Sequence, residues 1–421
     1  MVEILHTEGM KKPPRPPAGH SYTILKQLCQ LLPGHLVMQL AKEHHVTERS
    51  RSFSPWSHVV ALLHAHLTHA ISLNDVCDAL QLNAPALSTV RGATPPSRNA
   101  LSHANRERNA DLAEALYWHM QAQVLNQPEG FGQGPLRRGY LRRLHTPLHA
   151  IDSTTITLVA NSLDWAQHRR RKAAAKCHLR LDLHSFLPQC VIVTSAQGHD
   201  SRQARPLCAG VASGEIVIFD KAYVDFVHLR ELTARGVWWV SRGKDNLQYR
   251  VVRTLATTTH ASIVRDELIE LTVERTHAAY PQLLRRVVAR VERDGRMEEL
   301  VFLTNQLQWS AWTVAELYRS RWEIEVFFKE LKQTLQLSDF LGYNENAVRW
   351  QIWIGLLVRL LLRWLRFRHG WRHSLARLCT LVRATLWRRW DLALLVATYG
   401  TAAPPGRLRA APEQAYLPGF A

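Results

Sequence analysis

Cysteine is scarce in this 421-residue chain, and its spacing shows no metal-binding pattern. None of the six cysteines forms a Cys-x-x-Cys pair; they are Cys29, Cys77, Cys177, Cys190, Cys208 and Cys379. Structural zinc sites are built from closely spaced cysteine and histidine ligands, and a disulfide framework needs a dense set of cysteines in a short chain. The sequence therefore indicates neither kind of site.

Long uninterrupted apolar runs are also missing. The most apolar stretch, residues 350–365, contains Arg359 and Arg363, so it is typical of a buried helix rather than a membrane span. The first residues, Met-Val-Glu-Ile-Leu-His, contain no apolar signal-peptide core. We therefore expect a cytoplasmic protein with no membrane partner.

Acidic side chains are in the minority. The chain has 35 Asp and Glu against 53 Lys and Arg, which gives a net charge of +18 and a pI near 10.1. The basic residues are spread through the chain, so extended contacts with a polyanion are expected. Nucleic acid is the first candidate for that partner, ahead of a membrane surface.

Composition divides the chain into five segments. They are a basic Pro-rich arm (1–20), a helical N-terminal domain expected to bind DNA (21–125), a basic linker (126–146), an α/β domain with a β-rich insertion near 244–297 (147–342), and a helical C-terminal region with a loose tail (343–421). Two helices before residue 83 fit either a helix-turn-helix or a plain bundle. Tryptophans alternate with arginines in the C-terminal region, where they could stack on DNA, although a tryptophan-filled core is the favoured interpretation.

Residues 313–337 are predicted to form one uninterrupted helix. Thr313 and Glu316 fit a capping box, and no Gly or Pro follows until Gly342. Apolar residues gather on one side of this helix. A stripe within roughly 80° beside them combines one carboxylate with three cations and a phenol, namely Tyr318, Arg321, Glu325, Lys329 and Lys332.

This stripe resembles the Tyr-Arg-Glu-Lys signature of the DDE transposases of insertion sequence family 4, in which two, three and six residues separate the four positions. The ordinary alternative is a salt-bridged surface face, since Glu325 and Lys329 are an i,i+4 pair. The resemblance covers residues 148–340 with motif support. Residues 20–95 resemble, more loosely, the helical N-terminal domain of one branch of that family. The resemblance to this transposase family implies an RNase H-like catalytic core and two more carboxylates upstream of Glu325.

Two predicted strands supply acids in the required order. Asp152 is the only acid in residues 148–159. Asp220 follows a solid apolar run, typical of a buried parallel strand, and is itself followed by Lys-Ala-Tyr, which resembles the family's Asp-x-(Gly/Ala)-(Tyr/Phe) box. Either aspartate alone could be a turn cap or a surface residue. Together with Glu325 they predict a catalytic, metal-binding triad.

The resemblance implies two-metal-ion phosphoryl transfer. The three acids would hold two Mg²⁺ ions about 4 Å apart, with Mn²⁺ as a substitute, to activate the attacking oxygen and stabilise the leaving 3′ oxygen. Tyr318, Arg321, Lys329 and Lys332 would contact the DNA. A cation beside Mg²⁺ is repelled unless phosphate lies between them, so replacing Arg321 is expected to leave Mn²⁺ affinity unchanged.

The activity implied is cut-and-paste transposition. The protein would bind terminal inverted repeats in double-stranded DNA, cleave at the transposon ends and join the 3′ ends to target DNA, with a homodimer in the synaptic complex. Relatives form a DNA hairpin and hold a flipped base on an aromatic ring, for which Trp238, Trp239 and Trp309 are candidates. His199 and Asp200 resemble a recurrent family pair, and we interpret Asp200 as a turn cap rather than as an acid that supports the metal ligands.

Two other functions remain open from sequence. One is an RNase H-like DNA nuclease without strand transfer, which the long flanking helical regions and the Tyr-Arg-Glu-Lys stripe disfavour. The other is a catalytically silent DNA-binding relative, which the complete set of acids disfavours.

Overall fold

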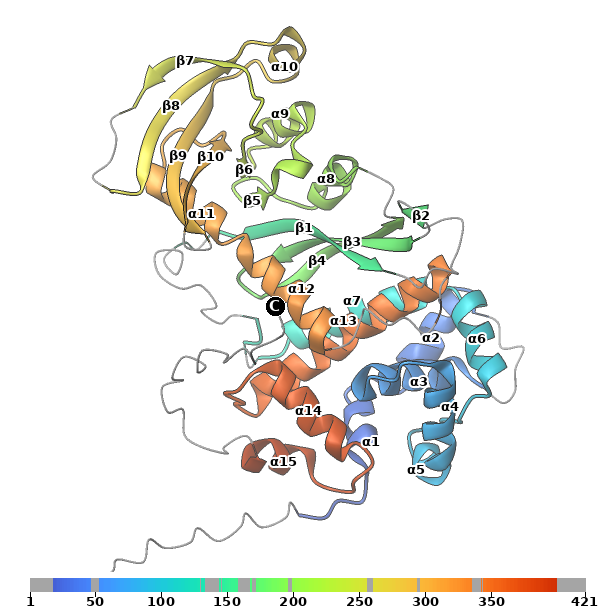
Figure 1. The fold of residues 1–421 in the computed structure, drawn as a ribbon. Helices are drawn as coiled ribbons and strands as arrows, with labels where there is room; N and C mark the ends of the chain where they lie inside the picture. The colour runs from blue at the N-terminus through green and yellow to red at the C-terminus, as the bar shows by residue number, and fades with distance from the viewer. Residues whose placement is uncertain are drawn as a thin grey trace, which may run out of the picture.

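A ten-stranded sheet occupies one half of the computed structural model, and a body of helices occupies the other (Figure 1). The structure describes residues 18–46, 53–128, 130–132, 144, 146–157, 167–168, 172–195, 199–255, 260–293, 296–334, 342 and 344–399. Most of the expected N-terminal arm, much of the basic linker and the expected C-terminal tail lie outside these residues. No helix within them is both long and apolar enough to cross a membrane.

The sheet is mixed. Its strands are β1 (Leu148–Thr157), β2 (Gln167–His168), β3 (Lys172–Asp182), β4 (Leu187–Ser195), β5 (Ile216–Phe219), β6 (Trp238–Arg242), β7 (Tyr249–Thr254), β8 (Ile263–Leu271), β9 (Leu284–Arg293) and β10 (Arg296–Thr304). Their order is β2-β3-β1-β5-β6-β10-β9-β8-β7, and β4 also pairs with β3. Strands β1, β5 and β6 are parallel, whereas all other pairs are antiparallel. The predicted α/β class is thus confirmed.

The sheet separates two hydrophobic cores, because alternate residues of a strand point to opposite faces. On β1, Ala150 faces the core shared with the helical half, whereas Ile151 faces the core beneath α8 (Ser201–Cys208) and α9 (Phe226–Ala234). Every residue of β5 is buried. The prediction of a buried parallel strand at this position is therefore confirmed.

The helical half joins both ends of the described chain. Its helices are α1 (Ile24–Cys29), α2 (Leu36–Glu43), α3 (Pro55–Thr68), α4 (Leu73–Leu82), α5 (Ala84–Ser88), α6 (Arg98–Glu107), α7 (Asp111–Leu125), α13 (Glu345–Arg368), α14 (Leu375–Thr385) and α15 (Leu392–Tyr399). Helix α13 packs against α3, α6, α7 and α14. A backbone bridge between Gly19 and Trp390 ties the N-terminal segment to the C-terminal helices.

Tryptophans of the C-terminal region fill this helical core. Trp350 and Trp353 are at most 1% exposed, and the Trp350 indole N–H donates to the carbonyl of Arg108 at 2.7 Å. The core interpretation is therefore confirmed for these residues.

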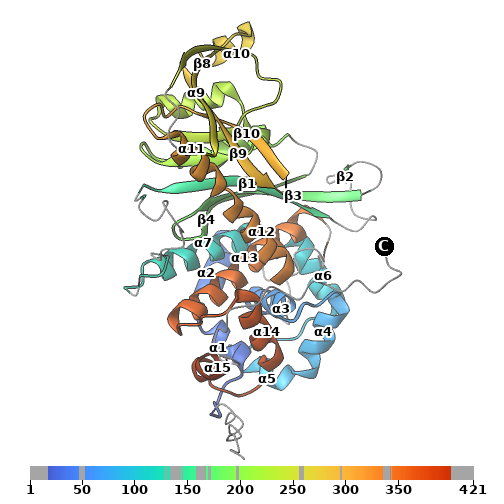
Figure 2. The same cartoon turned by 60° about the vertical axis from the view of Figure 1, so that its left-hand side comes forward.

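The prediction of one helix over 313–337 is wrong. The chain forms α11 (Ala311–Arg319) and α12 (Trp322–Thr334), and α12 lies between the sheet and the helical half (Figure 2). Helix α11 starts earlier than predicted because the Oγ of Ser310, not Thr313, caps it by accepting the N–H of Thr313 at 3.0 Å.

The break between α11 and α12 lies at Ser320 and Arg321. The Ser320 hydroxyl donates to the carbonyl of Leu317 at 2.6 Å, and the Arg321 N–H donates to the carbonyl of Tyr318, three residues back, at 3.0 Å. A serine that bonds its own helix backbone competes with the regular hydrogen-bond ladder. The spacing of apolar residues contains no information about such a bond, so that spacing could not predict the break.

The buried histidines of α3 predict loss of stability in acid. Both ring nitrogens of His64 are buried without a hydrogen-bond partner, and burial lowers its pKa to about 4. An unfolded histidine titrates near 6.5, so the unfolded chain binds more protons between these values, and stability falls as the pH drops from 7 towards 4. His64→Leu should remove about 1–2 kcal/mol of the loss between pH 7 and 5.

This change is measured by urea unfolding at the two pH values. His103→Leu is the matched control, because His103 is exposed on α6 in the same half of the protein. An equal pH dependence in the His64→Leu and wild-type proteins would contradict the assignment of this loss to His64.

Candidate active site

Three carboxylates line one groove at an edge of the sheet. Ile151 of β1 pairs with Phe219 of the parallel strand β5, so the next residue along each strand, Asp152 and Asp220, emerges beside the other on the same face. Glu325 lies in the first turn of α12, which contacts β1. All three acids line a groove of about 1540 Å³.

Arg321 bridges two of these acids. Its Nη1 lies 2.8 Å from Oδ2 of Asp152, and its Nη2 lies 2.5 Å from Oε1 of Glu325. The helix break places Arg321 just ahead of α12, where its side chain reaches both Asp152 of β1 and Glu325 of α12.

Asp152 carries a perturbed carboxyl group. Burial raises its pKa to about 6, and the charges of Asp220 and Glu325 add to the rise, whereas the cation of Arg321 and the N–H of Ser153 oppose it. Partial burial and neighbouring like charges both disfavour an ionised carboxylate. The site therefore favours a positive partner for Asp152.

The remaining residues of the stripe, Tyr318, Lys329 and Lys332, differ in their distance from the acids. The Tyr318 hydroxyl donates to Oδ1 of Asp220 at 3.3 Å, and burial raises the pKa of this phenol to about 12. The Nζ of Lys332 donates to the backbone carbonyl of Thr155 on β1 at 2.9 Å. Lys329 is exposed on α12. The structure thus brings Tyr318 and Arg321 to the acids, while Lys332 fastens α12 to β1.

The donor set fits hard divalent cations, because it consists of carboxylate oxygens on three different elements. In the described part of the chain, however, no three His, Cys, Asp or Glu side chains stand close enough together to hold a metal ion. The guanidinium of Arg321 lies between Asp152 and Glu325, which it contacts through Nη1 and Nη2. The acids fit Mg²⁺ chemically, provided that Arg321 withdraws.

Arginines from the helical half form one wall of the groove. Arg359 is buried and paired with Glu330 at 2.8 Å, and Arg363 donates to the carbonyl of Ser185 at 3.0 Å, so both have structural partners. Arg366 is exposed on the same helix and lines the groove. This wall therefore combines fixed positive charge with an accessible cation.

Trp322 is the most exposed of the tryptophans that line the groove. It is 61% exposed and follows Arg321 in the chain. Trp239 is fully buried, and Trp238 packs against Trp309 with ring centroids 6.4 Å apart. The three candidates named from sequence are thus placed in or against the core, whereas Trp322 was missed. Its position off the apolar face of the helix was the available signal.

Asp200 was also misassigned from sequence. It precedes α8, but its side chain makes no cap hydrogen bond. Its carboxylate instead contacts Lys176 of β3, with Oδ1 2.5 Å from Nζ. The turn-cap interpretation is therefore wrong.

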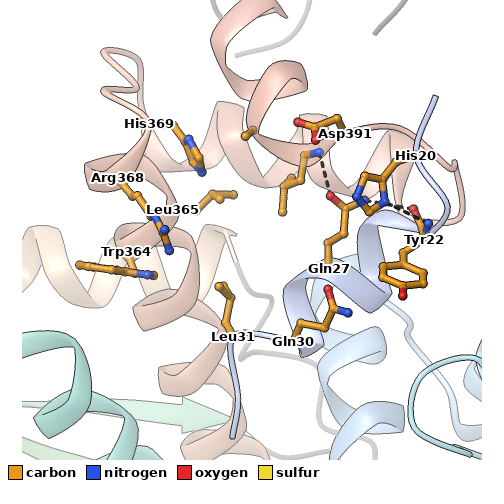
Figure 3. A pocket seen from close by; sticks show the side chains of 12 residues that line it. His20, Tyr22, Gln27, Gln30, Leu31, Trp364, Leu365, Arg368, His369 and Asp391 are labelled. Atoms are coloured by element: carbon orange, nitrogen blue, oxygen red, sulfur yellow. Dashed lines mark hydrogen bonds between the residues drawn. The ribbon is translucent and has the colours of Figure 1, made fainter. Parts of the chain in front are cut away.

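A smaller pocket of about 260 Å³ lies in the helical half, away from the acids (Figure 3). Gln27 of α1 joins its walls, because its Nε2 donates to the carbonyl of Trp390 at 2.7 Å and its Oε1 accepts the N–H of Leu392 at 3.0 Å. These contacts join the two ends of the described chain, which gives the pocket a structural explanation.

Comparison with known proteins agrees with this geometry. Residues 144–361 match the family described as "Transposase DDE domain", and residues 20–89 match a "Domain of unknown function (DUF4372)". Putative transposase y4zB of Sinorhizobium fredii is 30% identical over 276 residues, which are 65% of this chain and 76% of that protein.

Two further relatives come from insertion sequences. The probable transposase for element IS5377 of Geobacillus stearothermophilus is 30% identical over 53% of this chain, which spans 58% of that relative's length. Transposase InsG for element IS4 of Escherichia coli is 25% identical over 44% of this chain and 42% of its own length.

One solved structure, a piggyBac transposase synaptic complex with hairpin DNA, overlaps 87% of this chain and 80% of that chain. Its TM-score of 0.44 and identity of 9% are too low to carry an argument. The family match, in contrast, spans half of the chain, and the resemblance found in the sequence is confirmed. The chain belongs to the family of DDE transposases.

Proposed function

We propose that the protein is a cut-and-paste DNA transposase that cleaves transposon ends and joins their 3′ ends to target DNA. The observation that carries the proposal is the meeting of Asp152, Asp220 and Glu325 in one groove of a protein with a net charge of +18. Carboxylates from two neighbouring strands and one helix suit two-metal-ion phosphoryl transfer. Nucleic acid suits the charge.

The strand order supports an RNase H-like core for this activity. Strands β4-β3-β1-β5-β6 would form that core, with β1, β5 and β6 parallel and β3 antiparallel. The strands β7 to β10 extend it on the β6 side. In this proposal residues 147–342 are the catalytic domain, with a β-rich insertion near 244–297, and the helical segments 21–125 and 343–421 flank it.

When bound in the groove, two Mg²⁺ or Mn²⁺ ions would supply Lewis-acid activation of the attacking and leaving oxygens. Asp152, Asp220 and Glu325 would hold them. Tyr318 keeps Asp220 oriented through its hydroxyl. Lys332 holds the helix of Glu325 against β1 through its bond to the carbonyl of Thr155.

Arg321 has two uses for its charge in this proposal. Without DNA, it neutralises Asp152 and Glu325. When a DNA end is bound, the same planar guanidinium can turn to a phosphate flanking the scissile one, which it can bind through two parallel hydrogen bonds. Movement of Arg321 would then free carboxylate oxygens for the metal ions, which links DNA binding to metal loading.

Double-stranded DNA is the proposed partner, and a homodimer is the proposed synaptic state. Lys329 is exposed on α12, and Arg366 is exposed on α13 where it lines the groove, so both cations are accessible to DNA phosphate. The exposed indole of Trp322 beside Arg321 offers a stacking surface for an unpaired base.

The acids should be required for chemistry but not for DNA binding. Asp220→Asn removes one charged ligand while preserving side-chain volume, so we expect Mg²⁺-dependent cleavage of transposon-end duplex to fall at least about 1,000-fold. DNA affinity, measured by gel shift without metal, should be maintained. Asp245→Asn is the control, since Asp245 is exposed and pairs with Lys221. Near wild-type cleavage by the Asp220→Asn protein would refute the assignment.

Arg321→Ala should tighten Mn²⁺ binding in the DNA-free protein and weaken cleavage. We expect this because Arg321 contacts Asp152 and Glu325. The sequence alone predicts an unchanged Mn²⁺ affinity. Loss of the competing cation should lower the Mn²⁺ dissociation constant about tenfold, as measured by electron paramagnetic resonance of free Mn²⁺. Arg319→Ala is the matched control, because the Arg319 side chain is 80% exposed. Weaker Mn²⁺ binding by Arg321→Ala would show that Arg321 supports the site.

DNA binding should depend steeply on salt. Contacts with about six phosphates would give a slope of about −5 for log affinity against log salt. Lys329→Ala should make this slope shallower by about one unit. A nearly flat salt titration of the wild-type protein would contradict the proposed use of the positive charge.

A further inference from the structure

A group of polar side chains lies on the face of the sheet opposite the acids. Ser153 follows Asp152 on β1 and therefore points to the other face. His178 of β3 pairs with Ser153 across the two strands and shares that face. We call the group the rear cluster; it consists of Ser153, Lys176, His178, Asp200 and Tyr223.

Asp200 is the negative charge of the rear cluster. Its Oδ1 lies 2.5 Å from the Nζ of Lys176, and its Oδ2 accepts the hydroxyl of Ser153 at 3.4 Å. The side chains of Asp200 and Lys176 are only 15% and 20% exposed. A pair so sheltered is costly to break from one side, because the remaining charge is left without a partner.

Tyr223 closes the other side of the rear cluster. Its hydroxyl lies 3.0 Å from Nδ1 of His178, and the opposite ring nitrogen lies 3.2 Å from the hydroxyl of Thr194. Nδ1 of His178 also lies 4.0 Å from Oδ1 of Asp200. The tyrosine is 1% exposed, so this contact is held within the core.

Both strand-borne acids are connected to the rear cluster through the backbone. The N–H of Ser153 donates to Oδ1 of Asp152 at 2.8 Å. The N–H of Tyr223 donates to the carbonyl of Asp220 at 3.0 Å, within the turn that follows β5. Ser153 touches Asp200 directly and holds the carboxylate of Asp152, and Tyr223 reaches Asp200 through His178 and holds the backbone carbonyl of Asp220.

We propose that Asp200 is a positioning residue of the active site, which sets the relative placement of Asp152 and Asp220 from the opposite face of the sheet. This inference rests on the proposed metal-dependent function. Residues that orient metal ligands typically change metal affinity by 10- to 100-fold when they are replaced. A salt bridge serving stability alone would change the melting temperature without such a change in affinity.

The test is Mn²⁺ binding to the DNA-free protein, measured by electron paramagnetic resonance of free Mn²⁺ alongside the melting temperature. Asp200→Asn should raise the Mn²⁺ dissociation constant about tenfold. Asp266→Asn is the matched control, because Asp266 forms an ion pair with Arg285 at 2.7 Å that is more deeply buried and lies in the β7–β10 extension. It should lower the melting temperature and leave Mn²⁺ binding unchanged.

A double variant separates positioning from stability. Lys176→Met combined with Asp200→Asn removes the cation that the single change leaves unpaired, so the melting temperature should recover while Mn²⁺ binding stays weak. Wild-type affinity in Asp200→Asn, or recovery of affinity in the double variant, would overturn the proposal. Asp220→Asn is measured in the same series. If it too binds Mn²⁺ like the wild type, the proposed metal site has failed, rather than the role of Asp200.

Discussion

The groove depends on the compensation of negative charge at its acids. Asp152 is partly buried, and the neighbouring charges of Asp220 and Glu325 disfavour its ionised form further. The guanidinium of Arg321 provides compensation by contacting Asp152 and Glu325 together. In the proposed function, the acids would hold divalent ions that compensate the same negative charge, and Arg321 would contact DNA phosphate.

Local features of the chain create this arrangement. The parallel register of β1 and β5 brings Asp152 and Asp220 to the same edge, and the break before α12 lets Arg321 reach β1. Because neighbouring residues of a strand face opposite ways, Ser153 carries a contact from Asp152 through to the rear cluster. The sheet thus supports its acids from both faces.

Sequence reasoning succeeded where a signal is local and repeated. The apolar run before Asp220 predicted a buried parallel strand, and the spacing around Glu325 led to the family. It failed where a single hydrogen bond decides the outcome, as for the Ser320 hydroxyl that accompanies the helix break. It also failed for Asp200, whose partner Lys176 lies 24 residues away and is brought close by the folding of β3. Contacts between residues that are distant in the sequence produce no periodic pattern from which they could be predicted.

The most direct test is a structure of the protein with Mn²⁺ and a duplex that ends in the element's terminal repeat, read from the DNA flanking its gene. Anomalous scattering at the manganese edge would locate the ions independently of the protein. The account predicts two manganese peaks bound by Asp152, Asp220 and Glu325, with Arg321 on a DNA phosphate. A complex in which the end is bound, the manganese lies elsewhere and Arg321 still bridges Asp152 and Glu325 would contradict it.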